Sequence, residues 1–188
     1  LSEKANESIE KYLNGEITDI RTIEDKTFKP EIITYKKSSL ETEDKEVVIG
    51  KIRHEVGHAK NSDYRLLVEG MKLAQDQGYL STSWVNIENA IEDPRINNLE
   101  SGESETVRQK IAALYEEWKK ETTQYIGTQP ATRQLGLNII HYWLTGESIP
   151  TLKNEEVIKV FKEIEPKLNQ LFESNNSEEN FKTIKNEI

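Results

Sequence analysis

The sequence of 188 residues contains no cysteine, which excludes a disulfide framework and leaves histidine, aspartate and glutamate as the side chains that can bind a metal. Its 25 basic and 34 acidic residues give a net charge of -9, so no broad basic surface is expected and nucleic acid is not an expected partner. The length suits one domain, which we assign to residues 1–175, followed by a polar helical tail at 176–188.

The sequence shows no signal for membrane insertion or export. No apolar run approaches the length that spans a bilayer, and no signal-peptide pattern opens the chain. We therefore expect a cytoplasmic protein without membrane contact. The first residue is Leu1 rather than methionine, which indicates a trimmed chain start and leaves a removed leader open as an alternative.

Apolar spacing predicts a mainly α fold with a small β element. Residues 2–14 have the spacing of an amphipathic helix, and residues 32–35 form the best strand candidate. Such a strand either pairs with an extended peptide beside an active-site cleft or serves only as a connector. The next helical pattern has an acid-rich, capped start near residues 42–46 and ends at Asn61. Further helical patterns cover residues 64–77, 83–93, 105–126, 132–144 and 155–172. The last of these is interrupted or kinked at Pro166.

The pattern His54-Glu55-Val56-Gly57-His58 is the most informative stretch of the chain. Histidines four residues apart on a helix share one face, with Cβ atoms about 5–6 Å apart, so both imidazoles can bind one metal ion. Glu55 then lies beside the metal and can accept a proton from the water that the metal holds. The chain has only three histidines, and two of them form this HExxH pattern, which is typical of zinc peptidases.

The alternative interpretation of this pattern is a solvated helix that carries the three polar residues incidentally. The flanking apolar residues favour a buried helix instead, in which polar groups need partners. These flanking residues are Val47, Val48, Ile49, Ile52 and Val56.

Two segments together resemble a known family. HEVGHAKNSDY (54–64) and NAIEDPRI (89–96) are similar to the HExxH metallopeptidase-like segment of proteins associated with von Willebrand factor A domains, of the cobaltochelatase and nitric-oxide-reductase-activation type. Asn89, Glu92, Asp93 and Arg95 match the second motif of that family, N-x-x-E-D-x-R. The resemblance covers about residues 45–100. It implies a zincin-like, gluzincin-like helical metallopeptidase domain with one Zn²⁺ ion and a von Willebrand factor A domain protein as partner.

The third metal ligand is expected among Glu88, Glu92 and Asp93. On an ideal helix Glu88 and Glu92 border the apolar side about 40° apart, whereas Asp93 lies roughly opposite. Pro94 is expected to end this helix near Glu92 and to leave Asp93 as the cap of a new helix. Helix geometry makes Glu88 and Glu92 nearly equal candidates for the third ligand. The family resemblance selects Glu92 as the ligand. Asp93 or Asn89 is then expected to hold a metal-binding histidine by a hydrogen bond without contacting the metal itself.

The predicted chemistry is hydrolysis of a peptide bond by water at the zinc ion. Two histidines and a carboxylate leave a fourth position for the water, whose proton Glu55 accepts and returns to the departing amine. The tetrahedral oxyanion also needs a hydrogen-bond donor. The candidates for this donor or for substrate contact are Tyr64, Arg95, His141 and Tyr142. A lone histidine on an apolar helix, such as His141, is more often a core residue.

The pattern thus predicts a zinc metallopeptidase that acts on a peptide or protein substrate. The alternative is a metal-containing scaffold that works through protein partners and keeps a vestigial or regulatory peptidase site. A hydrolase of non-peptide amides would use the same residues. Glu55 favours catalysis, because a structural zinc site has four protein ligands and needs no general base.

Overall fold

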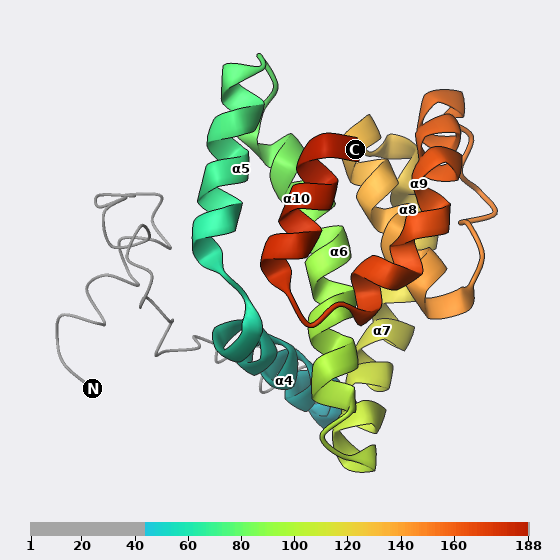
Figure 1. The fold of residues 1–188 in the computed structure, drawn as a ribbon. Helices are drawn as coiled ribbons and strands as arrows, with labels where there is room; N and C mark the ends of the chain where they lie inside the picture. The colour runs from blue at the N-terminus through green and yellow to red at the C-terminus, as the bar shows by residue number, and fades with distance from the viewer. Residues whose placement is uncertain (1–43, 188) are drawn as a thin grey trace, which may run out of the picture.

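The computed structural model describes residues 44–187, which form a bundle of helices (Figure 1). The elements are α4 (Lys45–Asn61), α5 (Tyr64–Asp76), α6 (Ser81–Ser101), α7 (Glu105–Tyr125), the 3₁₀ helix η1 (Ile126–Thr128), α8 (Ala131–Thr145), α9 (Glu155–Glu173) and α10 (Ser177–Glu187). The mainly α class is confirmed, and residues 44–187 contain no strand. The predicted helix at 2–14 and the strand candidate at 32–35 lie outside the described residues. Within residues 44–187, every helix is too short or too polar to cross a bilayer.

Short polar residues and glycine mark several helix ends where the sequence predicts them. Asp44 caps the start of α4 and Asp63 caps the start of α5, and each side chain accepts a hydrogen bond from the backbone N–H two residues later. Gly146 ends α8 with a φ of 74°, a left-handed conformation that glycine adopts at low cost. Helix α9 continues through Pro166 without interruption.

Helix α6 also continues through a proline, so the prediction that it ends near Glu92 is wrong. Pro94 lies in its interior, where a proline removes one backbone hydrogen bond and costs about 3 kcal/mol. The flanking Ile91 and Ile96 are almost fully buried. Burying each side chain of this size contributes about 1.5–3 kcal/mol, so packing offsets the lost bond. Asp93 consequently stays within α6 and does not cap a new helix.

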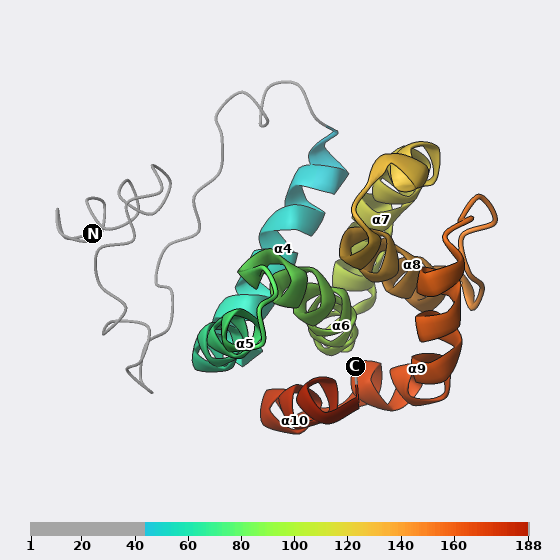
Figure 2. The same cartoon turned by 90° about the horizontal axis from the view of Figure 1, so that it is seen from above.

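Helix α6 is the central element of the bundle (Figures 1 and 2). It contacts α4, α5, α7, α8, α9 and α10. The apolar core gathers mainly around α6, α7, α8 and α9 and includes Ile91, Ile111, Ile139 and Phe161. Because α4 and α5 also pack on α6, the polar residues beside its apolar stripe face other helices rather than open solvent.

Two glycines let α4 lie close to its neighbours. A Cβ atom at Gly50 would lie 2.3 Å from the carbonyl oxygen of Lys110 in α7, and a Cβ atom at Gly57 would lie 2.3 Å from Cγ2 of Ile96 in α6. Atoms of side chains normally pack at about 3.5–4 Å, so neither position admits a larger residue without movement. The glycine of the HExxH pattern therefore brings α4 directly against the part of α6 that carries Asp93.

The C-terminal segment, predicted as a polar tail, forms α10, which packs against α5 and α6. Its apolar side chains Phe181 and Ile184 are buried. The ring of Phe181 lies 5.3 Å from the ring of Trp84 in α6. Helix α10 thus closes one side of the bundle next to the predicted site.

Candidate metal centre

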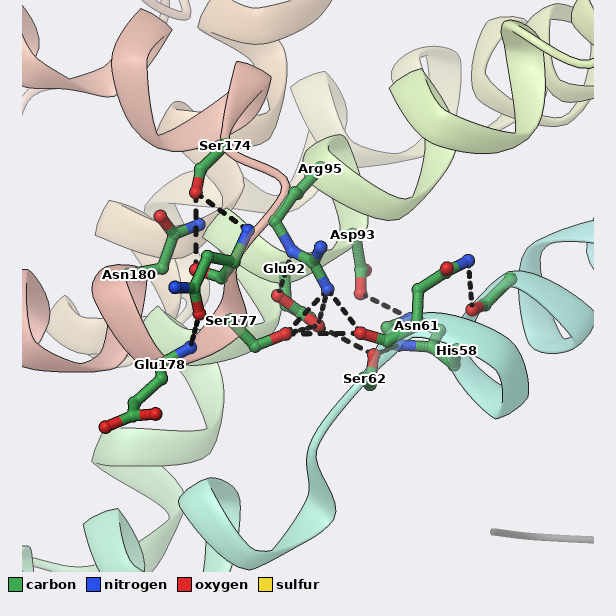
Figure 3. Close-up of polar contacts among 12 residues, drawn as sticks. His58, Asn61, Ser62, Glu92, Asp93, Arg95, Ser174, Ser177, Glu178 and Asn180 are labelled. Carbon is green, nitrogen blue, oxygen red and sulfur yellow. Dashed lines mark hydrogen bonds and ion pairs between the residues drawn. The ribbon is translucent and has the colours of Figure 1, made fainter.

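Helices α4 and α6 bring three potential ligand atoms together. The Nε2 atoms of His54 and His58 lie 3.2 Å apart. Asp93 Oδ1 lies 3.2 Å from Nε2 of His58 and 3.8 Å from Nε2 of His54. Figure 3 shows the Asp93 carboxylate pointing from α6 toward His58. The three atoms therefore converge from two helices on one point.

The other ring nitrogen of each histidine has a partner. His54 donates its Nδ1–H to Oδ1 of Asn97 over 3.0 Å. His58 donates its Nδ1–H to Oγ of Ser62 over 2.8 Å, and the Ser62 hydroxyl donates to Glu92 Oε1 over 2.7 Å. In a neutral histidine, the nitrogen opposite to the donor carries a lone pair. Both Nε2 lone pairs are thus available at the point where the carboxylate oxygen also lies.

Such an arrangement needs a positive charge between the three atoms, because two lone pairs and a carboxylate oxygen repel one another. A proton is one such charge. Burial lowers the pKa of His58, but the hydrogen bond and charge of Asp93, with the charges of Glu92 and Glu55, outweigh this effect and raise the pKa above 6.5. One proton can join only one pair of these atoms, whereas a metal ion can bind all three.

The separations fit a zinc ion. Two nitrogens bound to one tetrahedral zinc lie about 3.3 Å apart, because each Zn–N distance is about 2.0–2.1 Å. The observed distance between the two Nε2 atoms is 3.2 Å. Two imidazoles and one carboxylate are also a known ligand set of catalytic zinc sites, and the contacts to both Nδ1 atoms are those that orient zinc-binding histidines.

Glu92, the expected third ligand, faces a different side of α6 from Asp93. Its carboxylate accepts hydrogen bonds from Nε of Arg95 over 2.7 Å and from Nη2 over 2.6 Å, and both residues are buried. Ser62 and Ser177 also donate to it (Figure 3). Hydrogen bonds therefore connect Glu92 to His58 through the Ser62 hydroxyl. Arg95, a candidate for substrate contact, is 1% exposed and is engaged inside the protein.

Glu88 and Asn89 lie one helical turn before Glu92 and Asp93, respectively. Glu88 lines a small cleft between α5, α6 and α10, and it is not part of the converging group. Burial, together with the negative charges of Glu92 and Asp93, raises the pKa of Glu88 to about 8. Asn89 is half-buried on α6.

The remaining candidates lie in three places. Glu55 is exposed on α4 beside His54, as its position in the HExxH pattern requires. Tyr64 begins α5, close in sequence to the histidines. His141 is a buried core residue of α8 that donates its Nδ1–H to the carbonyl oxygen of Glu147 over 2.8 Å.

Tyr142 belongs to the same part of the core as His141. Its ring packs against Phe161 of α9 with 5.5 Å between the centroids. The structure therefore does not bring His141 or Tyr142 to the converging group.

Sequence reasoning missed three residues around the histidines: Ser62, Asn97 and Tyr115. Ser62 follows His58 by four residues and Asn97 follows Asp93 by four, so helical spacing could have identified both if α6 had been predicted to continue through Pro94. Asn97 also donates its Nδ2–H to Oη of Tyr115 in α7 over 2.7 Å.

No sequence pattern linked Tyr115 to the site, because α7 reaches it only through tertiary packing. Burial raises the pKa of Tyr115 well above 10, and the charges of Asp93 and Glu55 add to this effect. The phenol of Tyr115 therefore stays neutral and keeps its hydroxyl as a hydrogen-bonding group.

Comparisons of the chain with protein-family models, with curated proteins and with solved structures find no match. The functional argument therefore rests on the arrangement of side chains around His54 and His58.

Proposed function

We propose that this protein is a zinc-dependent metallopeptidase of zincin-like character, in which His54, His58 and Asp93 hold one Zn²⁺ ion. One observation carries the proposal: two Nε2 atoms and one carboxylate oxygen converge while both Nδ1–H groups are engaged elsewhere. Asp93 takes the role of third ligand in this proposal. Glu92 supports His58 through Ser62.

The residues around the ion have separate tasks in the proposed reaction. When bound, zinc polarises the peptide carbonyl and makes water more acidic. Glu55 accepts the proton of the attacking water and delivers it to the departing amine. Asn97 and Ser62 hold the imidazole rings in place. Tyr64, at the start of α5, is the remaining candidate among the four for stabilising the oxyanion.

Three protein ligands favour catalysis over a purely structural role. A structural zinc site is closed by four protein ligands, whereas a catalytic site keeps one position for water or substrate. The proposed substrate is a peptide or protein. A scaffold that works through a protein partner is the second candidate, and it predicts zinc binding without hydrolysis.

The test combines metal analysis with an activity assay on three proteins: wild type, Glu55→Gln and, as a matched control, Glu116→Gln. Glu116 is an exposed glutamate on α7. Each protein is analysed for bound metals and incubated with a mixed peptide library, whose products are identified by mass spectrometry. We expect about one zinc per chain in all three. Cleavage by Glu55→Gln should fall by about 100-fold or more, as for loss of a general base.

The outcomes separate the candidates. Wild type without zinc, or with iron in its place, would contradict the proposed site. Undiminished cleavage by Glu55→Gln would exclude Glu55 as the base. Zinc in all three proteins with no cleavage of any peptide would favour the scaffold.

A further inference from the structure

We infer that Arg95 is a positioning residue for the metal centre and that it acts through Glu92 and Ser62. Arg95 makes Glu92 a pure acceptor, and Glu92 in turn gives the Ser62 hydroxyl one direction. This direction keeps the proton of His58 on Nδ1 and leaves Nε2 for the metal. The inference rests on the proposed function, because it assigns a role toward the same ion.

The first step concerns the contact between Arg95 and Glu92. Nε of Arg95 donates to Oε2 of Glu92 over 2.7 Å, and Nη2 donates to Oε1 over 2.6 Å. A guanidinium has only N–H donors. Both oxygens of Glu92 therefore face donors, as the oxygens of a carboxylate do, and this side chain can only accept hydrogen bonds.

The second step concerns the hydroxyl of Ser62, which has a single hydrogen. Its Oγ lies 2.7 Å from Oε1 of Glu92 and 2.8 Å from Nδ1 of His58. If Ser62 donates to Glu92, then Nδ1–H of His58 donates to Oγ, and both contacts are hydrogen bonds. If Ser62 donated to Nδ1 instead, two acceptor oxygens would face each other over 2.7 Å without a hydrogen between them. The first arrangement is favoured, because it has one more hydrogen bond and that bond is made to a charged acceptor.

The third step concerns the proton of His58. A neutral imidazole has one proton, so a proton held on Nδ1 leaves a lone pair on Nε2. This Nε2 atom lies 3.2 Å from Nε2 of His54 and 3.2 Å from Oδ1 of Asp93. The direction that begins at Arg95 thus ends at the point where the ligand atoms converge.

Arg95 also holds the backbone next to Ser62. Its Nη2 donates to the carbonyl oxygen of Asn61 over 2.9 Å and to Oγ of Ser177 over 2.7 Å (Figure 3). Asn61 is the last residue of α4 and directly precedes Ser62. The same guanidinium therefore fixes both the Glu92 carboxylate and the turn that carries the hydroxyl.

The test replaces the buried ion pair by two apolar residues, in the double variant Glu92→Leu with Arg95→Met. Such a replacement is often neutral or stabilising, whereas removal of one partner leaves an unpaired buried charge. The carbonyl oxygen of Asn61 keeps a donor in this variant, because the hydroxyl of Ser177 lies 3.3 Å away.

Two further variants accompany this double variant. The matched control is Glu116→Leu with Lys119→Met, which removes an exposed ion pair of the same spacing on α7. Ser62→Ala removes the hydroxyl itself and changes only one half-buried residue.

The first measurement locates the His58 proton from ¹⁵N chemical shifts of the metal-free proteins at pH 8.5, above the usual imidazole pKa of about 6.5. All these proteins also carry Asp93→Asn, because the Asp93 carboxylate accepts from Nε2–H and would itself favour a proton there. An amide donates or accepts and favours neither nitrogen. We expect the proton on Nδ1 in the Asp93→Asn parent and beside the control pair. With the apolar pair, or with Ser62→Ala, it should move toward Nε2.

The second measurement is zinc affinity, determined by chelator competition in proteins that retain Asp93. The variant with the apolar pair should bind zinc about 10-fold more weakly than wild type, as for loss of a group that orients a ligand. The control pair should change the affinity by less than about threefold. Ser62→Ala should cost about 10-fold in wild type but less than about threefold beside the apolar pair, because both changes interrupt the same chain of hydrogen bonds.

The inference is overturned if the His58 proton stays on Nδ1 beside the apolar pair or in Ser62→Ala. It is also overturned if the two losses of zinc affinity add in full, because independent structural defects would do so. If the apolar pair prevents folding, the proton position in Ser62→Ala carries the test. If wild type binds no zinc, the proposed function fails, and the proton position in the metal-free proteins then decides the inference by itself.

Discussion

Asp93 and Glu92 are neighbours in the sequence, yet their carboxylates serve different sides of α6. Successive residues of a helix point about 100° apart, so adjacent side chains rarely share a partner. Asp93 faces His58 of α4, and Glu92 faces Arg95 and the start of α10. The two acids of the motif therefore have separable roles, which substitution can distinguish.

We predict that Asp93→Asn lowers zinc affinity more than Glu92→Gln does. Both changes replace a carboxylate by an amide of equal size, so each is the matched control of the other. Loss of the charged ligand should weaken zinc binding by more than about 100-fold, whereas loss of Glu92, which acts through Ser62, should weaken it by about 10-fold. Chelator competition measures both values. A larger loss in Glu92→Gln would return the ligand role to Glu92.

At the scale of elements, the site depends on how closely α4 approaches α6. The histidines belong to α4 and the carboxylate belongs to α6, so a shift of one helix separates the ligand atoms. The side chain of Glu100, one helical turn beyond Ile96, also lies under Gly57. Packing at this crossing therefore controls both stability and metal affinity.

We predict that Gly57→Ala destabilises the protein and weakens zinc binding. Its new methyl group would lie 2.3 Å from Cγ2 of Ile96 and 2.8 Å from Cγ of Glu100, so α4 must move outward. Overpacking of this kind typically costs about 1–3 kcal/mol. Denaturant unfolding and chelator competition measure the two effects.

The control for this change is Gly127→Ala, where a Cβ atom meets no other atom within 4 Å. It should leave zinc affinity unchanged. Equal unfolding free energies for Gly57→Ala and wild type would show that α4 is not held as closely as the structure indicates.

At the scale of the whole molecule, α10 closes the cleft that contains Glu88, and this makes stability depend on pH. The pKa of Glu88 is raised from 4.5 to about 8 by burial and by the charges of Glu92 and Asp93. Below pH 4.5 the carboxyl is protonated in both the folded and the unfolded states. Between pH 4.5 and about 8 only the unfolded state ionises, so this group lowers the free energy of unfolding as the pH rises.

We predict that Glu88→Gln makes the metal-free protein more stable at pH 8.5, with a gain that nearly vanishes at pH 4. One pKa unit corresponds to about 1.4 kcal/mol, and solvent screens part of the shift at a half-buried carboxyl, so we expect a gain of about 1–3 kcal/mol. Urea unfolding at pH 4, 6.5 and 8.5 measures it. A gain that does not grow with pH would contradict the raised pKa.

The sequence by itself determined the mainly α class, several helix ends and the pairing of His54 with His58. These features follow from local rules: apolar spacing, capping side chains and the repeat of 3.6 residues per turn. Asp63 and Gly146 act where those rules place them. The zinc ion and the peptidase activity remain predictions that the sequence suggests.

Only the tertiary structure decided which acid meets the histidines. The sequence argument treated α6 as a helix with one buried side that Pro94 would end, and with the family resemblance it preferred Glu92 as the ligand and gave Asp93 a supporting role. In the folded protein α6 is surrounded by other helices, whose packing outweighs the lost backbone bond and keeps Asp93 in the helix facing α4. The contact of Tyr115 with Asn97 depends on α7 in the same way. Contacts between segments far apart in the sequence have no local signature, because they depend on how whole helices pack.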